Sequence, residues 1–248
     1  MRLDRRLVDI GAFESRAKAQ AAIRAGKVRV DGSVAAKPAA DIPDTAQIEI
    51  EGPAHPYVSR GGVKLAAALD AFSLDPAGRV CLDLGASTGG FTEVLLRRGA
   101  ARVYAVDVGA AQLHARIAAD PRVVNLEKTH ARDLTPAVIP TPPSLIVCDV
   151  SFISLKKALP PALALAAPEA ALVALVKPQF EVGPAHVGRG GVVRDAQIAQ
   201  DACDGIARWL AGRGWAVTGA IDSPILGGEG NREFLIGARR RGGEEPKS

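Results

Sequence analysis

Cysteine is scarce in this sequence, with only 3 of 248 residues, at Cys81, Cys148 and Cys203. The three cysteines are widely spaced and form no C-x-x-C pair, which excludes the usual zinc-knuckle and thiol-redox motifs. A small odd number of isolated cysteines suits a reducing compartment better than a disulfide framework. We therefore expect a cytoplasmic protein without structural disulfides.

Long hydrophobic runs are also missing. The amino terminus, M-R-L-D-R-R-L, has a charge every few residues and lacks the apolar core of a signal peptide. The most apolar stretch covers residues 159–176, and Pro160, Pro161, Pro168 and Glu169 interrupt it. We predict no membrane span from this pattern and expect a soluble protein without a membrane partner.

Aromatic residues make up only 4% of the chain, and its 4 histidines are scattered. Phe13 is the one aromatic residue in the first 55 positions, so we do not expect this segment to stack the bases of single strands. We interpret all the histidines as structural or surface residues, at positions His55, His114, His130 and His186.

The remaining composition is that of a globular protein, with 48% hydrophobic and 23% charged residues and a net charge of +4. The positive charge is concentrated at the start, where residues 1–30 contain eight basic and three acidic side chains. A basic excess of this kind permits a nucleic-acid partner without requiring one.

Residues 1–55 have the pattern of a small domain with two helices and a small sheet. Val28 and Val30 alternate with charged residues, and Asp31-Gly32 is a typical two-residue hairpin turn. Residues 56–62 are rich in glycine and proline and predict a linker. Residues 63–240 form the predicted large domain, and we expect residues 241–248 to be a flexible tail.

The large domain alternates predicted strands and helices, which favours a doubly wound α/β sheet. The early strands are short and almost continuously apolar, as expected when helices cover both faces of a sheet. The predicted strands are 80–84, 102–106, 123–126, 145–149, 171–176, 215–223 and 233–239. The predicted helices are 64–72, 91–98, 111–118, 154–167 and 196–212.

The most informative string is V-C-L-D-L-G-A-S-T-G-G-F, residues 80–91, in which a strand leads through a glycine-rich loop into a helix. In an open α/β sheet a ligand binds beyond the carboxyl ends of the strands. The spacing of Gly85, Gly89 and Gly90 is not G-x-G-x-x-G, so a dinucleotide is the weaker interpretation. Gly85 taken alone would fit any tight turn between a strand and a helix.

Asp107 ends the next strand, where its carboxylate could accept hydrogen bonds from the ribose of a nucleoside cofactor. Asp133 could add a third polar contact from the following loop. The predicted cofactor-binding residues are therefore Asp83, Gly85, Ser87, Gly89, Gly90, Phe91, Asp107 and Asp133.

The string D-L-G-A-S-T-G-G-F resembles the S-adenosylmethionine loop of class I methyltransferases, and within that class the RNA ribose 2′-O-methyltransferases of the FtsJ type. The amino-terminal pattern R-L-D-x-x-L … S-R-x-x-A … G-x-V-x-V-D-G resembles an RNA-binding module named after a small-subunit ribosomal protein. Together with S-R-G-G-V-K-L at the junction, the chain resembles the TlyA, or hemolysin A-like, family. The resemblance implies a Rossmann-like fold, S-adenosyl-L-methionine as cofactor, and methylation of cytidine ribose in ribosomal RNA or ribosomal subunits.

Methylation of a ribose hydroxyl needs a base or a cationic environment, because the hydroxyl is a weak acid. Asp149 and Lys177 end two predicted strands at the edge that carries the glycine loop. A lysine beside a second lysine can lose its proton more easily. Lys64 and Glu233 complete a candidate catalytic set that resembles the Lys-Asp-Lys-Glu tetrad of FtsJ-type enzymes, in which the residue corresponding to Lys177 lies nearest the hydroxyl. A lysine-rich site disfavours a divalent metal, and we expect none.

Other chemistries are less well supported. The position of an N-P-P-Y segment for base amino-group methylation is held by C-D-V-S, and Cys148 is predicted to be a buried, inert thiol. A non-catalytic RNA-binding protein, a membrane-active cytolysin and a pseudouridine synthase stay as alternatives. The predicted RNA contacts are Arg5, Arg6, Arg16, Lys18, Arg24, Lys27, Arg29 and Arg60, since phosphates attract such side chains regardless of base sequence. Arg189 and Arg194, in the loop P-A-H-V-G-R-G-G-V-V-R that could cover the site, are further candidates.

Overall fold

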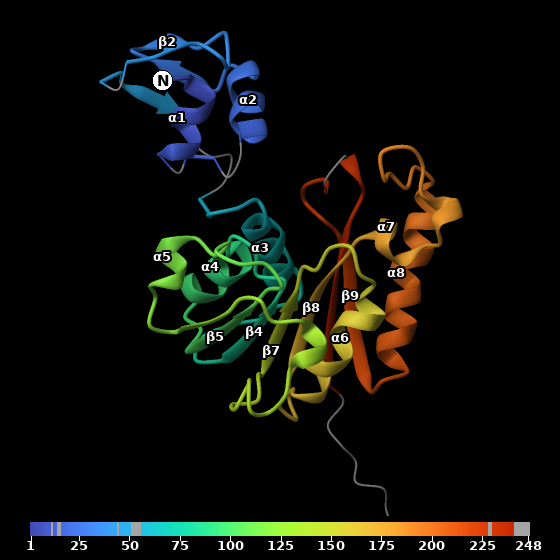
Figure 1. The fold of residues 1–248 in the computed structure, drawn as a ribbon. Coiled ribbons are helices and arrows are strands. Elements are labelled where there is room, and N and C mark those ends of the chain that lie inside the picture. The colour runs from blue at the N-terminus through green and yellow to red at the C-terminus, as the bar shows by residue number, and fades with distance from the viewer. Residues whose placement is uncertain (11, 14–15, 44, 51–55, 228–229, 241–248) are drawn as a thin grey trace, which may run out of the picture. The chain divides into compact units, whose positions relative to one another are not determined.

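The computed structural model describes residues 1–240 apart from 11, 14–15, 44, 51–55 and 228–229 (Figure 1). The predicted tail, 241–248, lies outside the described residues. The chain divides into two compact units between Pro56 and Tyr57, inside the predicted linker. The linker is shorter than predicted, because helix α3 (Gly61–Ala71) already begins at Gly61.

The amino-terminal unit contains two helices and a three-stranded sheet of order β2-β1-β3. Its elements are α1 (Leu3–Asp9), α2 (Arg16–Arg24), β1 (Val28–Val30), β2 (Ser33–Val34) and β3 (Ile48–Ile50). The predicted hairpin turn is confirmed, since Asp31 and Gly32 have φ angles of 48° and 77°. Both values lie in the left-handed region that a two-residue hairpin turn of this type requires.

A buried carboxylate joins the two helices of this unit. Asp4 is fully buried and accepts hydrogen bonds from Arg2 at 3.0 Å, Arg16 at 3.1 Å and Gln20 at 2.7 Å. The hydrogen bond from Arg2, followed by that from Gln20, holds the pKa of Asp4 well below its usual range. One predicted RNA contact, Arg16, is therefore also part of the domain's own framework.

The large unit is built on a seven-stranded sheet of order β6-β5-β4-β7-β8-β10-β9. Its first five strands in chain order run parallel to one another, and β10 runs antiparallel to both β8 and β9. The strands are β4 (Val80–Leu84), β5 (Arg102–Val106), β6 (Val123–Leu126), β7 (Leu145–Cys148), β8 (Ala171–Val176), β9 (Trp215–Asp222) and β10 (Phe234–Arg240).

Helices cover both faces of this sheet, which confirms the predicted α/β class (Figure 1). Side chains of α3, α4 (Gly90–Arg97) and α5 (Ala115–Ala118) pack with Cys81 and Val103 on one face. Side chains of α6 (Leu155–Ala164) and α8 (Ala196–Ala211) pack with Leu82 and Leu84 on the other. Short helices occupy Pro178–Glu181 (α7), Ala131–Asp133 and Pro184–His186.

The predicted helix 111–118 is wrong in its first half, because only Ala115–Ala118 is helical. The carboxylate of Glu127 accepts hydrogen bonds from the backbone N–H groups of Ala111, Gln112 and Leu113 at 2.8–3.0 Å. These hydrogen bonds also lower the pKa of Glu127. The side chain of Glu127 thus accepts from the backbone N–H groups of residues 111–113, and this segment folds as a loop rather than as the first turn of a helix.

The predicted helix 154–167 is shorter than expected, yet it continues through Pro160 and Pro161. Ser154 caps its start by accepting a hydrogen bond from the Lys156 N–H at 3.2 Å.

Among the residues that the structure describes, no helix is both long and apolar enough to cross a bilayer.

The environment of Asp4 predicts acid sensitivity of the amino-terminal unit. Because its folded pKa is depressed, the stabilisation is present above the ordinary pKa of 3.8 and is lost as the pH falls below it. We expect Asp4→Ala to raise amide hydrogen exchange in residues 16–24 at pH 7 and to remove this acid sensitivity. Unchanged exchange in α2 would contradict the assignment, and Asp9→Ala, at an exposed carboxylate of α1, is the control.

Candidate active site

The glycine loop between β4 and α4 is confined by close packing on three sides. A Cβ atom on Gly85 would lie 2.6 Å from the carbonyl oxygen of Asp149 at the end of β7. A Cβ on Gly89 would lie 2.8 Å from Leu113, and one on Gly90 would lie 2.1 Å from Ser59. Gly85 and Gly89 also have φ angles of 86° and 96°, so both positions favour glycine through conformation as well as space.

Asp83 lies beneath this loop and is fully buried. Its Oδ2 accepts a hydrogen bond from the Thr92 hydroxyl at 2.6 Å, and its Oδ1 has no hydrogen-bond partner among the described residues. Burial is the main cause that raises the pKa of Asp83 to about 7, against the lowering effect of Thr92. A buried carboxylate with a free oxygen is suited to a cationic or hydrogen-bond-donating ligand group.

Asp107 connects the glycine loop to the next strand. Its Oδ2 accepts from the Ser87 N–H at 2.8 Å, and its Oδ1 accepts from the Gly109 N–H at 2.7 Å. Asp107 therefore orders the loop itself. Each carboxylate oxygen has a further lone pair, so the ribose contact stays a prediction.

Two predicted cofactor residues differ from the rest. Phe91 is 3% exposed and packs in the core with Leu65 of α3, so its side chain does not reach the loop surface. Asp133 is exposed and pairs with its neighbour Arg132 at 3.7 Å. Neither side chain is joined to the glycine loop by a described hydrogen bond.

The four predicted catalytic residues form two lysine–carboxylate ion pairs. Lys64 Nζ lies 2.5 Å from Glu233 Oε2, and Lys177 Nζ lies 2.7 Å from Asp149 Oδ1. The Lys64–Glu233 pair is almost completely buried, with side chains 9% and 2% exposed. Each lysine thus has a carboxylate, and not the other lysine, as its described charge partner.

Strand register explains why these pairs meet at one edge. Phe234 pairs with Val176, so the antiparallel direction of β10 places Glu233 opposite Lys177 at the next position. Asp149 follows the end of β7, which is parallel to β8. Strand β10 runs opposite to β8 and begins where β8 ends. The residue that begins β10 therefore lies at the carboxyl edge of the parallel strands β7 and β8.

Ser151 was not predicted, yet its hydroxyl accepts a hydrogen bond from Lys177 Nζ at 2.7 Å. Lys177 is therefore held from two sides by residues of one segment, Asp149–Ser151. The signal that could have found Ser151 is its polar side chain two residues beyond a buried strand end, in D-V-S-F.

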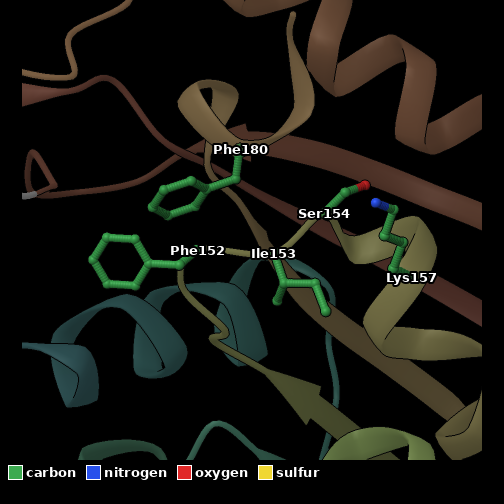
Figure 2. A pocket seen from close by; sticks show the side chains of 5 residues that line it. All are labelled: Phe152, Ile153, Ser154, Lys157 and Phe180. Carbon is green, nitrogen blue, oxygen red and sulfur yellow. The ribbon is translucent and has the colours of Figure 1, made fainter. Parts of the chain in front are cut away.

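Phe152 was also missed and is 90% exposed, three residues after Asp149. Its φ is 62°, and its ring centroid lies 5.3 Å from that of Phe180. Figure 2 shows the two rings with Ile153, Ser154 and Lys157, the side chains that line a pocket. The volume of this pocket is about 250 Å³. An exposed ring at such an edge can stack on a nucleobase.

The segment that precedes α3 is fixed to α4. Glu93, 3% exposed, accepts a hydrogen bond from the Val58 N–H at 2.6 Å and pairs with Arg97 and Arg116 at 2.7 Å. The Tyr57 ring lies 5.3 Å from the Arg97 guanidinium and leaves no room for a side chain at position 62. The start of the large unit is thereby held beside the glycine loop.

The predicted RNA contacts in the amino-terminal unit lie on α1, α2 and the start of the sheet. Six of the seven are exposed and Arg6 is half-buried. Arg60, at the start of α3 in the large unit, is exposed as well.

Cys148 is buried, as predicted, and burial raises the pKa of its thiol. Among the described residues no group of three or more His, Cys, Asp or Glu side chains could hold a metal ion.

Comparison with known proteins decides the family. A profile described as FtsJ-like methyltransferase matches residues 57–240, and one described as S4 domain matches residues 1–46. This chain belongs to the TlyA family of FtsJ-like methyltransferases. A relative from Mycobacterium tuberculosis, named 16S/23S rRNA (cytidine-2′-O)-methyltransferase TlyA, is 49% identical over 96% of this chain and 89% of its own length.

Two further similarities cover nearly the whole of this FtsJ-like methyltransferase. The protein named Hemolysin A from Brachyspira hyodysenteriae is 40% identical over 95% of this chain and 98% of its own length. A solved structure from Streptococcus thermophilus, which carries the provisional name of a hemolysin, matches with a TM-score of 0.80 and 39% identity. It covers 97% of this chain and 88% of that one.

The raised pKa of Asp83 predicts an unusual stability effect. Its folded pKa of about 7 exceeds the ordinary 3.8, so ionisation destabilises the fold progressively as the pH rises between these values. Asp83→Asn cannot ionise but can still accept from Thr92. We expect its stability relative to wild type to increase from pH 5 to pH 8 by roughly 2–4 kcal/mol, measured by urea unfolding.

Thr92→Val is the matched control, because it removes the donor and leaves the carboxylate. We expect it to be less stable than wild type at both pH values. An Asp83→Asn variant that loses stability relative to wild type as the pH rises would contradict the assignment.

Proposed function

We propose that this protein transfers a methyl group from S-adenosylmethionine to the 2′-hydroxyl of a cytidine in ribosomal RNA. The observation that carries the proposal is the pair of lysine–carboxylate contacts, Lys177–Asp149 and Lys64–Glu233, at the sheet edge that also holds the glycine loop. The name of the M. tuberculosis relative supports the reaction and the RNA substrate.

The residues around the glycine loop fit the proposed cofactor. Asp83 Oδ1 is buried without a partner among the described residues, and such an oxygen favours an ammonium or hydroxyl donor. Asp107 offers its remaining lone pairs at the end of β5 to ribose hydroxyls. When bound, S-adenosylmethionine supplies an electrophilic methyl group on its sulfonium sulfur.

The protein's own task is to position a ribose hydroxyl and take its proton. Lys177 is the proposed proton acceptor, and its Nζ is oriented by Asp149 and Ser151 at 2.7 Å each. Asp149 also balances the ammonium that forms. The buried Lys64–Glu233 pair joins α3 to the start of β10 beside this site. Lys64 is therefore given a structural role, and Lys177 the role of proton acceptor.

The amino-terminal unit, which matches the S4 domain and is called the S4 unit below, is the part that we propose docks on the RNA. Its exposed basic side chains can contact phosphates, and a rigid basic surface suits folded RNA, which proteins recognise largely by shape.

The first test is transfer of labelled methyl groups to unmodified ribosomal subunits and to their naked RNA. We expect label on ribose with wild type, and a loss of about 10²–10⁴-fold in kcat for Lys177→Met, which keeps side-chain volume without a basic nitrogen. Lys177→Arg should be as inactive, because a guanidinium keeps the charge but does not give up its proton.

Lys156→Ala is the control, since Lys156 is exposed on α6 and outside the proposed machinery. Full activity of Lys177→Arg would show that Lys177 acts only through its charge. A wild-type protein that binds RNA and cofactor but transfers no label would favour the non-catalytic alternative.

Docking by the S4 unit predicts a different signature. Arg24→Ala and Lys27→Ala should each raise the KM for RNA and lower the slope of log KM against log salt by about one, with kcat unchanged. Lys37→Ala, also exposed in this unit, is the control. The docking assignment fails if neither predicted variant changes the salt slope.

A further inference from the structure

A glycine-rich loop with two arginines, Gly188–Arg194, lies between the Pro184–His186 turn and α8. Gly188 and Val192 form an antiparallel bridge, and the turn between them contains Gly190 and Gly191 with φ angles of 79° and 76°. Atoms added at either glycine would meet nothing within 4 Å, so the tip of this arginine loop stands open.

Arg189 and Arg194 are both exposed, and neither forms an ion pair with a residue that the structure describes. Other exposed arginines of the large unit do have acidic partners, such as Arg116 with Glu93 at 2.7 Å. Among the described residues, the two positive charges of the arginine loop therefore have no ion-pair partner. Guanidinium groups held in this way are suited to the phosphate groups of RNA.

The side chain of one buried residue fixes this loop. Asn231 is 3% exposed, its Oδ1 accepts from the Val193 N–H at 3.0 Å, and its Nδ2 donates to the Gly191 carbonyl at 2.9 Å. Val193 itself is buried in the core. The loop base is thus held by a donor and an acceptor from one amide.

Asn231 belongs to the turn that carries Glu233. The Gly227 N–H donates to the Asn231 carbonyl at 2.8 Å, and a Cβ on Gly227 would lie 2.1 Å from Glu233 Oε1. Glu233 in turn pairs with Lys64. The arginine loop and the buried ion pair are therefore attached to the same short segment.

We propose that Asn231 is a positioning residue that holds the arginine loop against the active-site edge, so that Arg189 and Arg194 bind the phosphates of the RNA substrate. The inference rests on the proposed function. An amide is required because aspartate has no N–H for the Gly191 carbonyl, and its charge would face that oxygen. Asparagine at 231 is thereby explained by RNA positioning as well as by folding.

The test compares Asn231→Asp, the double variant Arg189→Ala/Arg194→Ala, and the triple variant, on unmodified ribosomal subunits. We expect Asn231→Asp and the double variant each to raise the KM and the Kd for RNA roughly threefold to tenfold, with kcat within about twofold. The double variant should lower the salt slope by about two. The triple variant should resemble the double, because the arginines act through the position that Asn231 sets.

The proposal is overturned if the increases in KM multiply in the triple variant. It is also overturned if KM is unchanged in the single or double variant, or if only kcat falls. Cofactor affinity and melting temperature are measured for every variant, and Asn231→Ala replaces Asn231→Asp if the buried charge prevents folding. Equilibrium RNA binding separates this inference from the proposed function. If the wild-type protein transfers no methyl group, the proposed reaction is refuted. The Kd values of the variants for RNA, compared with that of wild type, still test the role of the arginine loop.

Discussion

The close approach of Gly85 to the backbone of Asp149 is the constraint on which the site depends. With only 2.6 Å between a Cβ at position 85 and the Asp149 carbonyl, the glycine loop and the segment Asp149–Ser151 must be placed together. The loop therefore packs directly against the backbone of Asp149, the ion-pair partner of Lys177. The predicted cofactor loop and the proposed proton acceptor lie at one edge of the sheet because neighbouring parallel strands end side by side.

Buried polar groups at this edge select one arrangement. Lys64, Asp83, Asn231 and Glu233 are all less than 10% exposed. A buried polar group without its partner is unfavourable by about 1–3 kcal/mol, and by more when charged. Alternative packings that separate Lys64 from Glu233, or Asn231 from the arginine loop, are disfavoured for this reason.

Much of the fold could be predicted from the sequence, but long-range polar contacts could not. The boundaries of β4, β5, β6 and β8 agree with prediction because each is a short apolar run between polar turns. The helix at 111–118 failed because Glu127, distant in sequence, binds its first N–H groups. Asn231 and Ser151 escaped notice because their partners lie 38 and 26 residues away.

The antiparallel placement of β10 between β8 and β9 has a consequence for synthesis of the chain. The strands β6-β5-β4-β7-β8 can assemble from residues 80–176, but β8 then remains an open edge. Strand β9 emerges earlier than β10 and has no partner in the sheet until residues 234–240 follow it. The nascent protein thus carries an unpaired edge strand and an incomplete Glu233 site until residues 233–240 have left the ribosome.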